Sequence, residues 1–399
     1  MIIKKLKASG LISALTAVVL SASMLFGCGS APAEGLRSSC TAEEMAKRMG
    51  LGLNLGNTME AYHSAGSDNP DCEWVNVLGD NTPADYEVCW GAVETTQEII
   101  DGMKESGFST VRIPVFWGNM MENDGSYEIN SRYIKRVKEI VDYCDKADLI
   151  AVINCHHFDE FVIRRNSIED CVEIFTKLWT QIAEYFKDYN YNLVFEGYNE
   201  YLGGAQFNEE GELAELSQDD AYRLTNSLNQ AFVDAVRSTG SKNSDRVLII
   251  SGYNTNIDRT TSDRFIVPSD SAEDRLMVSV HYVDNAMYWS KKIGSQEWLD
   301  YTDSQIALLE EAFISKGIPV FMGECTGMYP PENFSDNRLY SHSSECLEIV
   351  LTKLLEKGIV PVIWDTNGGL YSRTEYKIPH DFENEVIKKL SDIYTYSYS

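Results

Sequence analysis

The amino-acid sequence predicts an α/β fold made of a single closed (β/α)8 TIM barrel. From residue 41 onward, short apolar runs alternate with longer amphipathic stretches. Several of the short runs are apolar without a break, which is typical of strands covered on both faces. No long linker rich in Ser, Pro or Thr divides the 399 residues. We therefore predict one domain over residues 41–399, built from eight strand–helix units.

Eight segments have the length and apolar content of strands, and the turn after the first of them argues against a doubly wound sheet. In chain order the segments are Leu51–Gly56, Thr110–Pro114, Ile150–Cys155, Leu193–Tyr198, Arg246–Ser251, Leu276–His281, Ile318–Gly323 and Val360–Trp364. A doubly wound sheet would carry a glycine-rich phosphate-binding turn after its first strand. Residues Gly52–Asn57 lack that spacing, so the barrel is favoured.

Amphipathic stretches between these segments predict the helices. The clearest are Ala92–Ser106, Asn130–Lys146, Ser167–Lys187, Asp219–Ser238, Ser304–Lys316 and His342–Lys357. Four of them are followed by a glycine, the residue that most often ends a helix in a left-handed conformation. These glycines are Gly107, Gly240, Gly317 and Gly358.

The composition excludes several classes of protein and partner. With 44% hydrophobic and 24% charged residues, the chain is neither disordered nor collagen-like and can bury a large core. Its 34 basic and 61 acidic residues give a net charge of −27, which repels phosphate backbones, so we expect no nucleic-acid partner. Nine cysteines are too sparse for a disulfide scaffold. Since no Cys-x-x-Cys or Cys/His cluster is present, we expect no metal and no other cofactor.

The first 40 residues are predicted to lie outside the barrel. Residues 1–27 combine a lysine-rich start with an apolar stretch over Leu11–Phe26, which is the pattern of a secretory signal. The last four residues up to Cys28 resemble a bacterial lipobox, which implies cleavage before Cys28 and lipid attachment to its sulfur. An ordinary signal peptide cut elsewhere, or an uncleaved anchor, is the alternative. Residues 28–40 then form a short tether. We expect an extracellular monomer held to the bacterial membrane through this lipid.

Polar and aromatic side chains follow nearly every predicted strand. In a barrel the loops after the strands meet at one end, so these side chains should gather there. They are Asn57, Arg112, His156, His157, Asn199, Glu200, His281, Glu324 and Trp364. The pattern predicts one site at the carboxyl-terminal end of the barrel.

Two glutamates in this group indicate the chemistry. Glu200 closes the fourth predicted strand and Glu324 the seventh, so their side chains can face each other across the barrel mouth. Glycoside hydrolysis needs such a pair: one protonated carboxyl for the leaving oxygen and one ionised carboxylate near the anomeric carbon. A separation of ~5–5.5 Å would predict a covalent intermediate and retained configuration.

The remaining polar groups fit the same reaction. Arg112 could hold an ionised carboxylate and keep its pKa low, or it could form a structural ion pair in the barrel core. The three histidines could donate hydrogen bonds to sugar hydroxyls or to the carboxylates, or simply be packed and satisfied. A metal site at His156 and His157 is disfavoured, because adjacent strand residues point to opposite faces.

Aromatic side chains supply flat apolar surfaces for sugar rings. Trp364 ends the eighth predicted strand, and Trp90, Trp117 and Trp289 lie in loops near the same end of the barrel. For the three loop tryptophans, ordinary packing is an equally good interpretation.

Six segments resemble the hallmark motifs of glycoside hydrolase family 5, in particular its bacterial endoglucanase and cellulase branch. They occur in the family's order as Gly52–Thr58, Val111–Val115, Asn154–His157, Phe195–Glu200, Ser279–Tyr282 and Met322–Glu324. The resemblance covers about residues 41–390. It implies a retaining endo-β-1,4-glucanase with a β-linked polysaccharide as substrate, Glu200 as acid/base and Glu324 as nucleophile.

The resemblance also implies supporting roles. Asn199 would bind the sugar 2-hydroxyl, and Arg112 with His156 would support the carboxylate pair. His281 would orient the acid/base, and Trp364 would form the floor of the −1 subsite. The neighbouring contacts would come from two further residues, Asn57 and His157.

One position departs from the family pattern. The family has a tyrosine two residues after the sixth-strand histidine, where it hydrogen-bonds the nucleophile, and this chain has Val283 there. Tyr282 is adjacent, but on a regular strand it would point to the other face. We therefore expect the nucleophile to lack a donor, at a cost of ~1.5–3 kcal/mol.

Three other functions stay open at this point. The same chemistry could act on xyloglucan, mixed-linkage glucan or mannan. A glycan-binding lipoprotein could have kept the groove and lost turnover through changes such as Val283. A metal-dependent barrel hydrolase is disfavoured, because the first strand carries no His-x-His.

Overall fold

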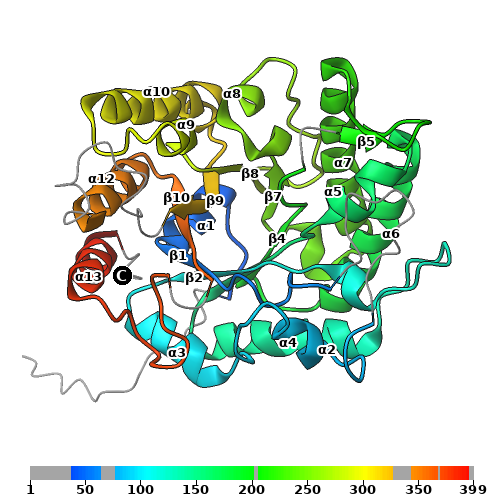
Figure 1. Ribbon diagram of the computed structural model, residues 1–399, viewed down its shortest axis with the longest axis horizontal. Coiled ribbons are helices and arrows are strands. Elements are labelled where there is room, and N and C mark those ends of the chain that lie inside the picture. Colours follow the sequence, from blue (N-terminus) through cyan, green and yellow to red (C-terminus); the bar gives the residue numbers. More distant parts are fainter. Residues whose placement is uncertain (1–36, 64–76, 202–204, 327–342, 367–368, 395–399) are drawn as a thin grey trace, which may run out of the picture. The chain divides into compact units, whose positions relative to one another are not determined.

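Eight parallel strands close into a barrel with helices around it, as the sequence predicts (Figure 1). The computed structural model describes residues 37–63, 77–201, 205–326, 343–366 and 369–394. The strands are Gly52–Asn54 (β1), Thr110–Ile113 (β2), Ile150–Ile153 (β3), Leu193–Glu196 (β4), Leu248–Ser251 (β7), Leu276–His281 (β8), Val320–Thr326 (β9) and Val360–Trp364 (β10). Each strand pairs with the next in chain order, and β10 pairs with β1 to close the barrel.

Most helices cover the outer face of the barrel while α1 lies across its amino-terminal end, and most begin with a side-chain cap. They are Ala42–Met49 (α1), Pro83–Glu87 (α2), Gln97–Glu105 (α3), Ser131–Lys146 (α4), Phe158–Phe161 (α5), Ile168–Phe186 (α6), Gln218–Ser238 (α7), Ile257–Thr260 (α8), Asn285–Trp289 (α9), Gln296–Ala312 (α10), Ser343–Glu356 (α12) and Asp381–Tyr394 (α13). Ser167 caps α6 and Ser217 caps α7, each accepting from the backbone N–H of the third helical residue. Short 3-10 turns occur at Trp117–Met120, Ile163–Arg165, Ser241–Ser244, Tyr253–Thr255 and Ile314–Lys316.

All six predicted helices are present, with two starts corrected. The helix predicted from Ala92 begins only at Gln97 (α3), since residues 92–96 are not helical and the backbone N–H of Thr95 donates to Glu87. The helix predicted from Ser304 begins earlier, at Gln296, because Ser295 accepts a hydrogen bond from the backbone N–H of Trp298 and caps α10 there. The four glycines expected to end helices all have positive φ. The short helices α1, α2, α5, α8 and α9, helix α13, and an antiparallel hairpin of Ala205–Phe207 (β5) and Leu213–Glu215 (β6) were not predicted.

The inward-facing side chains of the barrel form two layers. The lower layer is apolar and packs with helix α1, whose Met45 and Met49 are buried at the amino-terminal ends of the strands. Its strand residues are Ile150, Val152, Val194, Ile249, Met277, Phe321, Val360 and Val362. The upper layer is polar and buried, and consists of Asn54, Arg112, Asn154, Glu196 and Ser279. Because side chains alternate along a strand, four of these polar residues follow an apolar residue or a glycine two positions earlier, and Arg112 follows Thr110.

The barrel domain begins earlier than residue 41. Arg37 donates to Asp145 Oδ1 at 3.0 Å and to Asp148 Oδ1 at 3.1 Å, and Cys40 is buried beside α1. The predicted tether over residues 28–40 is therefore wrong at its end, because residues 37–40 pack on the barrel. The signal segment 1–27 and Cys28 lie outside the described residues, so their roles stay predictions.

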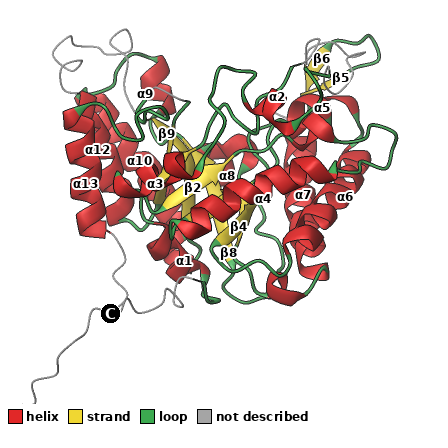
Figure 2. Cartoon of the chain, turned by 90° about the horizontal axis from the view of Figure 1, so that it is seen from below, coloured by secondary structure: helices red, strands yellow, loops and turns green. Residues whose placement is uncertain are grey.

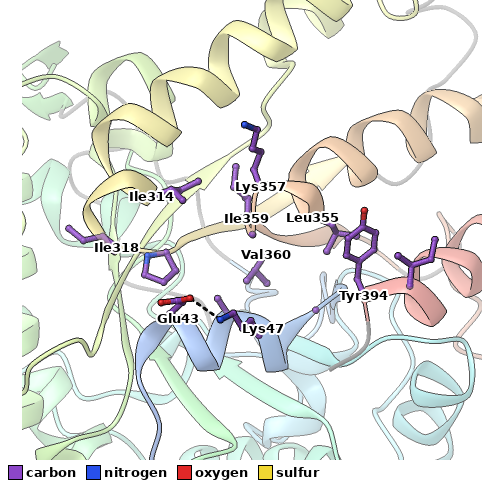
Figure 3. A pocket seen from close by; sticks show the side chains of 15 residues that line it. Glu43, Lys47, Ile314, Ile318, Leu355, Lys357, Ile359, Val360 and Tyr394 are labelled. Atoms are coloured by element: carbon purple, nitrogen blue, oxygen red, sulfur yellow. Dashed lines mark hydrogen bonds and ion pairs between the residues drawn. The ribbon is translucent and has the colours of Figure 1, made fainter. Parts of the chain in front are cut away.

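The amino-terminal end of the barrel also carries a cavity of about 630 Å³, drawn in Figure 3. Most of its lining is apolar, including Ile314, Leu355 and Tyr394, and its one lining carboxylate, Glu43, pairs with Lys47 at 2.8 Å. Figure 2 shows α1 at one end of the barrel and the β5–β6 hairpin at the other. The cavity therefore lies away from the strand ends where the sequence predicts the site. No helix in the described ranges has the length and apolar content to cross a membrane.

Candidate active site

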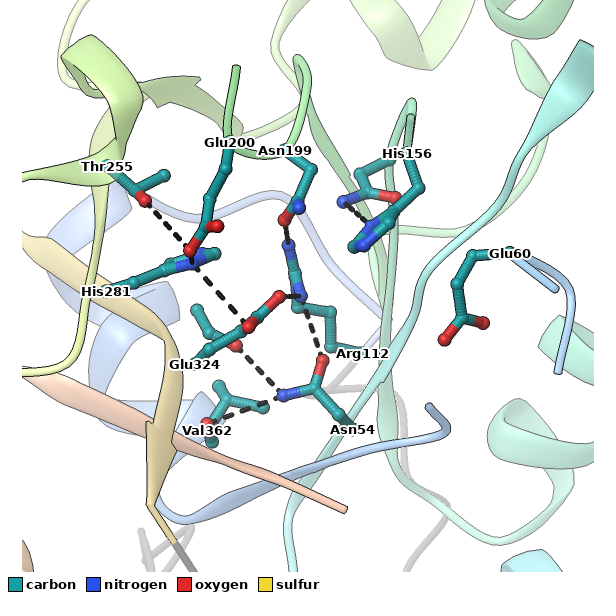
Figure 4. A network of polar contacts seen from close by, with 12 residues as sticks. Asn54, Glu60, Arg112, His156, Asn199, Glu200, Thr255, His281, Glu324 and Val362 are labelled. Carbon is teal, nitrogen blue, oxygen red and sulfur yellow. Dashed lines mark hydrogen bonds and ion pairs between the residues drawn. The ribbon is translucent and has the colours of Figure 1, made fainter. Parts of the chain in front are cut away.

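Glu200 and Glu324 face each other at the carboxyl-terminal end of the barrel (Figure 4). Glu200 follows β4 by four residues, and Glu324 lies inside β9 rather than after its end. One carboxylate oxygen of each, together with one nitrogen of His281, lies within 4.8 Å of the others. The side chain of Glu324 is 8% exposed and that of Glu200 is 38% exposed. The predicted pairing is confirmed, at a spacing close to that of carboxylates that form a covalent intermediate.

A β-bulge in β9 points Glu324 into the barrel. Phe321 belongs to the inward apolar layer, so regular alternation would turn Gly323 inward and Glu324 outward. The register instead shifts by one residue, between Met322 and Glu324 against β8 and between Met322 and Cys325 against β10. Such a bulge re-aims the side chain that follows it. Gly323 permits this approach, because a Cβ there would lie 2.9 Å from His281 Nε2.

Arg112 holds Glu324 from below, as predicted. The guanidinium is fully buried on β2 and donates to Glu324 Oε1 at 3.0 Å and to Asn199 Oδ1 at 2.7 Å (Figure 4). It also donates to Asn54 Oδ1 at 2.9 Å, while the amide nitrogen of Asn54 donates to the backbone oxygen of Gly323 at 2.9 Å. Asn54 thus fixes both Arg112 and the bulge that carries Glu324.

His281 binds Glu200, which confirms the predicted orienting contact. Its Nδ1 lies 2.7 Å from Glu200 Oε1 and 3.7 Å from Glu324 Oε2. Burial raises the pKa of Glu200, but the hydrogen bond from His281 and the positive charges of His281 and Arg112 outweigh burial and bring that pKa below its ordinary value. A proton can move between Nδ1 and Oε1 along this short contact. Substrate that covers Glu200 removes water from it and favours the protonated carboxyl.

Tyr282 donates a hydrogen bond to the nucleophile candidate, which corrects our expectation. Its hydroxyl lies 2.8 Å from Glu324 Oε2. Strand β8 ends at His281, and Tyr282 has a left-handed backbone with φ of 47°. Strand alternation therefore does not apply to Tyr282, and its ring turns toward Glu324. Although residue 283 is a valine, Glu324 therefore still has a hydrogen-bond donor, the hydroxyl of Tyr282.

Replacing Tyr282 with phenylalanine should lower kcat/KM by about 10- to 100-fold. A hydrogen bond to a charged group contributes roughly 1.5–3 kcal/mol, and each 1.36 kcal/mol corresponds to about tenfold in rate. Steady-state hydrolysis of an aryl β-cellobioside measures the change. Tyr191→Phe is the matched control, since its hydroxyl also donates to a carboxylate, Asp245 at 2.7 Å, but at the opposite end of the barrel. Equal loss in both variants would contradict the role of Tyr282.

His156 and Trp364 form one wall of the mouth. Their rings stack at 6.3 Å between centroids with 12° between the planes, and His156 Nδ1 lies 3.3 Å from Asn154 Nδ2. Burial and the nearby charges of His157, Arg112 and His281 lower the pKa of His156 well below its ordinary value. His156 is therefore a neutral hydrogen-bonding group near pH 7.

His157 joins this wall to an aromatic cluster, since its ring lies 4.7 Å from that of His156. Its backbone is left-handed, with φ of 55°, and its ring is 5.0 Å from that of Tyr62 and 5.8 Å from those of Trp90 and Phe116. Burial lowers the pKa of His157 to about 4. Since the rings of His156 and His157 contact each other, the expectation that the two point to opposite faces is wrong. Strand β3 ends at Ile153, so strand alternation does not apply to either residue.

The structure separates the three loop tryptophans, and the predicted substrate contact of Asn57 stays a prediction. Trp117 is 2% exposed and its indole N–H donates to the backbone of Asn154, so it is core packing and not a sugar platform. Trp90 is 41% exposed and Trp289 is 74% exposed. The backbone N–H of Asn57, at a φ of 59°, donates to Glu60. Among the described contacts, it is Asn54 that links the first strand to the carboxylates.

Five polar residues of the network were not predicted. Asn54, Asn154, Glu196 and Ser279 lie within or just beyond strands and point inward, so a search restricted to strand ends passes over them. Alternation offers a signal, because each interrupts an otherwise apolar inward face. The fifth, Thr255, donates to Glu200 Oε1 at 3.4 Å from a left-handed backbone with φ of 45°. A β-branched residue in that conformation is rare and is found mainly where function requires it.

Glu200, His281 and Glu324 are also the group of described residues whose ligand atoms are spaced for a metal ion. Each of the three already takes part in a hydrogen bond of 3.0 Å or less within the network. That arrangement serves proton transfer without an ion.

Comparison with known proteins agrees with this geometry. The family model for Cellulase (glycosyl hydrolase family 5) matches residues 69–369. The chain belongs to glycoside hydrolase family 5. It is 33% identical over 371 residues to an endoglucanase A of Clostridium longisporum, which covers 91% of this chain and 66% of that protein. The chain thus spans just under two thirds of that relative's length.

Solved structures of family 5 share the fold and the extent of the domain. A broad-specificity endoglucanase from an uncultured bovine rumen ciliate superposes with a TM-score of 0.74 at 29% identity, covering 88% of this chain and 98% of that one. A lichenase from a Caldicellulosiruptor species, in complex with cellotetraose, superposes with a TM-score of 0.75 at 29% identity, covering 89% and 96%. Family 5 enzymes retain configuration, which agrees with the carboxylate spacing.

Proposed function

We propose that the protein cleaves β-1,4-glucan within the chain and retains configuration, with Glu324 as nucleophile and Glu200 as acid/base. The main support for this proposal is that two carboxylates within 4.8 Å of each other differ in burial and in hydrogen-bond partners. Glu324 is buried and accepts from Arg112 and Tyr282, which both favour a charged carboxylate. Glu200 is partly exposed and shares a short hydrogen bond with His281, which suits a group that gains and loses a proton.

The first step forms an ester. An oxygen of Glu324 attacks the anomeric carbon, the glycosidic carbon–oxygen bond breaks, and its electron pair stays on the leaving oxygen, which takes a proton from Glu200. Asn199 supports this step, because its Oδ1 accepts from Arg112 at 2.7 Å and its amide N–H groups are left to bind a sugar hydroxyl.

The second step hydrolyses the ester. Glu200, now a carboxylate, takes a proton from a water molecule as the water oxygen attacks the anomeric carbon. The bond between that carbon and Glu324 breaks, and its electron pair returns to Glu324. Two displacements on opposite faces give net retention.

The nature of the substrate follows from charge and from the relatives. A net charge of −27 favours neutral polysaccharides over acidic ones. The solved relatives carry the names broad-specificity endoglucanase and lichenase. We therefore propose that both β-1,4-glucan and mixed-linkage glucan are cleaved, with xyloglucan and mannan as alternatives from the same chemistry. A glycan-binding protein without turnover has less support, since Tyr282 supplies the donor that Val283 lacks.

Product analysis on a panel of polysaccharides tests this proposal. Wild type should release short oligosaccharides from carboxymethylcellulose and mixed-linkage glucan, and viscosity should fall long before reducing ends accumulate, as internal cleavage requires. Glu324→Gln should release almost none. Equal release by the two proteins would contradict the mechanism, and binding without release would support the binding protein. A chelator should leave the wild-type rate unchanged, and a loss would support a metal enzyme.

We also propose export and lipid attachment at Cys28. The support is the sequence of residues 1–28, with its basic start, apolar stretch and lipobox-like end. Anchoring to the cell surface would bring the enzyme to polysaccharides too large to enter the cell.

A further inference from the structure

A third carboxylate, Glu196, lies beneath the proposed catalytic pair and takes part in neither step. It is the last residue of β4 and is fully buried in the polar layer. Its Oε2 accepts from Arg112 Nε at 2.7 Å and from Asn154 Nδ2 at 3.2 Å, and its Oε1 accepts from Ser279 Oγ at 2.7 Å. Both oxygens are thus held in place inside the barrel.

Glu196 shares the charge of Arg112 with Glu324. Arg112 is fully buried, and burial alone would lower its pKa, but the charges of Glu196 and Glu324 outweigh burial and raise it. The guanidinium reaches Glu196 through Nε at 2.7 Å and Glu324 through Nη1 at 3.0 Å. A buried charge without a partner is strongly destabilising, so this cation needs an anion at every stage of the reaction.

The proposed reaction removes one of these two anions. When Glu324 forms the ester it becomes neutral, and the negative charge moves to Glu200, which has given up its proton. Among the described contacts, Arg112 has no hydrogen bond to Glu200. In the intermediate, Glu196 is therefore the anion that remains in direct contact with Arg112.

We propose that Glu196 is the permanent counter-ion of Arg112, which keeps Glu324 reactive and stabilises the covalent intermediate. Glu196 is in these terms a positioning residue and not a catalytic one. This inference rests on the proposed function, because it requires Glu324 to be the nucleophile.

The substitution Glu196→Gln should change the two steps in opposite directions. Without Glu196, the whole charge of Arg112 acts on Glu324 and stabilises its ionised form. A more stable carboxylate is a poorer nucleophile and a better leaving group. Ester formation should therefore slow by about tenfold and ester hydrolysis should accelerate by a few-fold. The acid limb of the pH profile for ester formation should move to lower pH.

A mechanism-based inhibitor separates the two steps. A 2-deoxy-2-fluoro-β-cellobiosyl fluoride forms the ester and releases it slowly, so inactivation measures the first step and reactivation the second. Ser279→Ala is one control, because it removes a donor from Glu196 without changing charge, and both rates should fall together and by less. Glu87→Gln is another control, since Glu87 is a buried partner of Arg136 at 2.9 Å on the outer face. This variant should change neither the inactivation rate nor the reactivation rate.

The outcomes distinguish this inference from the proposed function. Mass spectrometry of trapped wild type should find the sugar on Glu324, and a sugar elsewhere would overturn both. If the sugar is on Glu324 but Glu196→Gln slows both steps in parallel with an unmoved acid limb, only the role of Glu196 is overturned.

A measurement on the wild-type protein covers the case in which Glu196→Gln does not fold. With carbon-13-labelled glutamate, the carboxyl signal of Glu196 should be that of a carboxylate before trapping and should not change on trapping, at the pH of the kinetic assays. A Glu196 that takes up a proton on trapping would overturn the inference, because it would no longer balance Arg112.

Discussion

Replacing Glu324 with alanine is expected to lower kcat/KM on β-glucan by at least about 10⁴-fold, since removal of a nucleophile leaves only binding and the acid/base. The side chain occupies a buried position between Arg112 and Tyr282, so the variant leaves a small polar space beside the anomeric carbon. Azide can enter this space. With an activated aryl β-cellobioside, azide should restore turnover and give the inverted glycosyl azide, which NMR identifies.

A matched control and a contrary result define this test. Glu43→Ala removes a carboxylate of a surface ion pair at the opposite end of the barrel, and it should keep the wild-type rate, because such pairs contribute little. A retained glycosyl azide from Glu324→Ala would mean that the nucleophile is still present and lies elsewhere.

Replacing Glu200 with glutamine is expected to slow hydrolysis of polysaccharide by about 10²–10⁴-fold, the usual contribution of a general acid or base. Poor leaving groups need its proton, so the loss should be far smaller for the ester-forming step of a dinitrophenyl cellobioside. Ester hydrolysis still needs a base, so the intermediate should accumulate and a burst of dinitrophenol should precede slow turnover. Stopped-flow absorbance measures the burst.

The pH profile and azide give independent readings on Glu200. Burial raises the pKa of Glu200, and the hydrogen bond from His281 with the charges of His281 and Arg112 lowers it. Since the glutamine variant has no carboxyl proton to lose, its polysaccharide hydrolysis should lack the fall in rate that wild type shows as the pH rises through the pKa of Glu200 in the substrate complex. Azide should rescue this variant with retention, in contrast to Glu324→Ala. Equal losses on activated and unactivated substrates would show that Glu200 is not the acid.

Much of the fold and the pairing of the two glutamates could be predicted, because both follow from the repeated strand–helix unit. Buried parallel strands produce apolar runs, and barrel closure brings the ends of all strands to one mouth. Glu200 and Glu324 then needed only to be close to the ends of their strands. A contact between Arg112 and a carboxylate followed from the same topology, whereas the contact of His281 with Glu200 was implied by the family resemblance. The structure shows both contacts.

Orientation within the site could not be predicted, because single backbone torsions decide it. Tyr282 reaches Glu324 through one left-handed residue, and Glu324 reaches the mouth through a one-residue bulge. The hydrophobic periodicity of the sequence gives no information on the left-handed residue or on the bulge. A glycine inside a buried strand is a known sign of a bulge, and Gly323 could have raised that possibility. Glu196 could have been found as the polar residue on an apolar inward face.

The two-layered interior determines from which side water can reach the buried ions. Helix α1 and the apolar layer lie under Arg112 and Glu196. Within the described part of the chain, these apolar side chains therefore separate the ions from solvent at the amino-terminal end, and the mouth is the side that faces water. A bound polysaccharide then shields the ions from bulk water on that side as well, and the local dielectric constant falls. The attraction between Arg112 and its carboxylates therefore becomes stronger at the stage of the reaction when charge is moving.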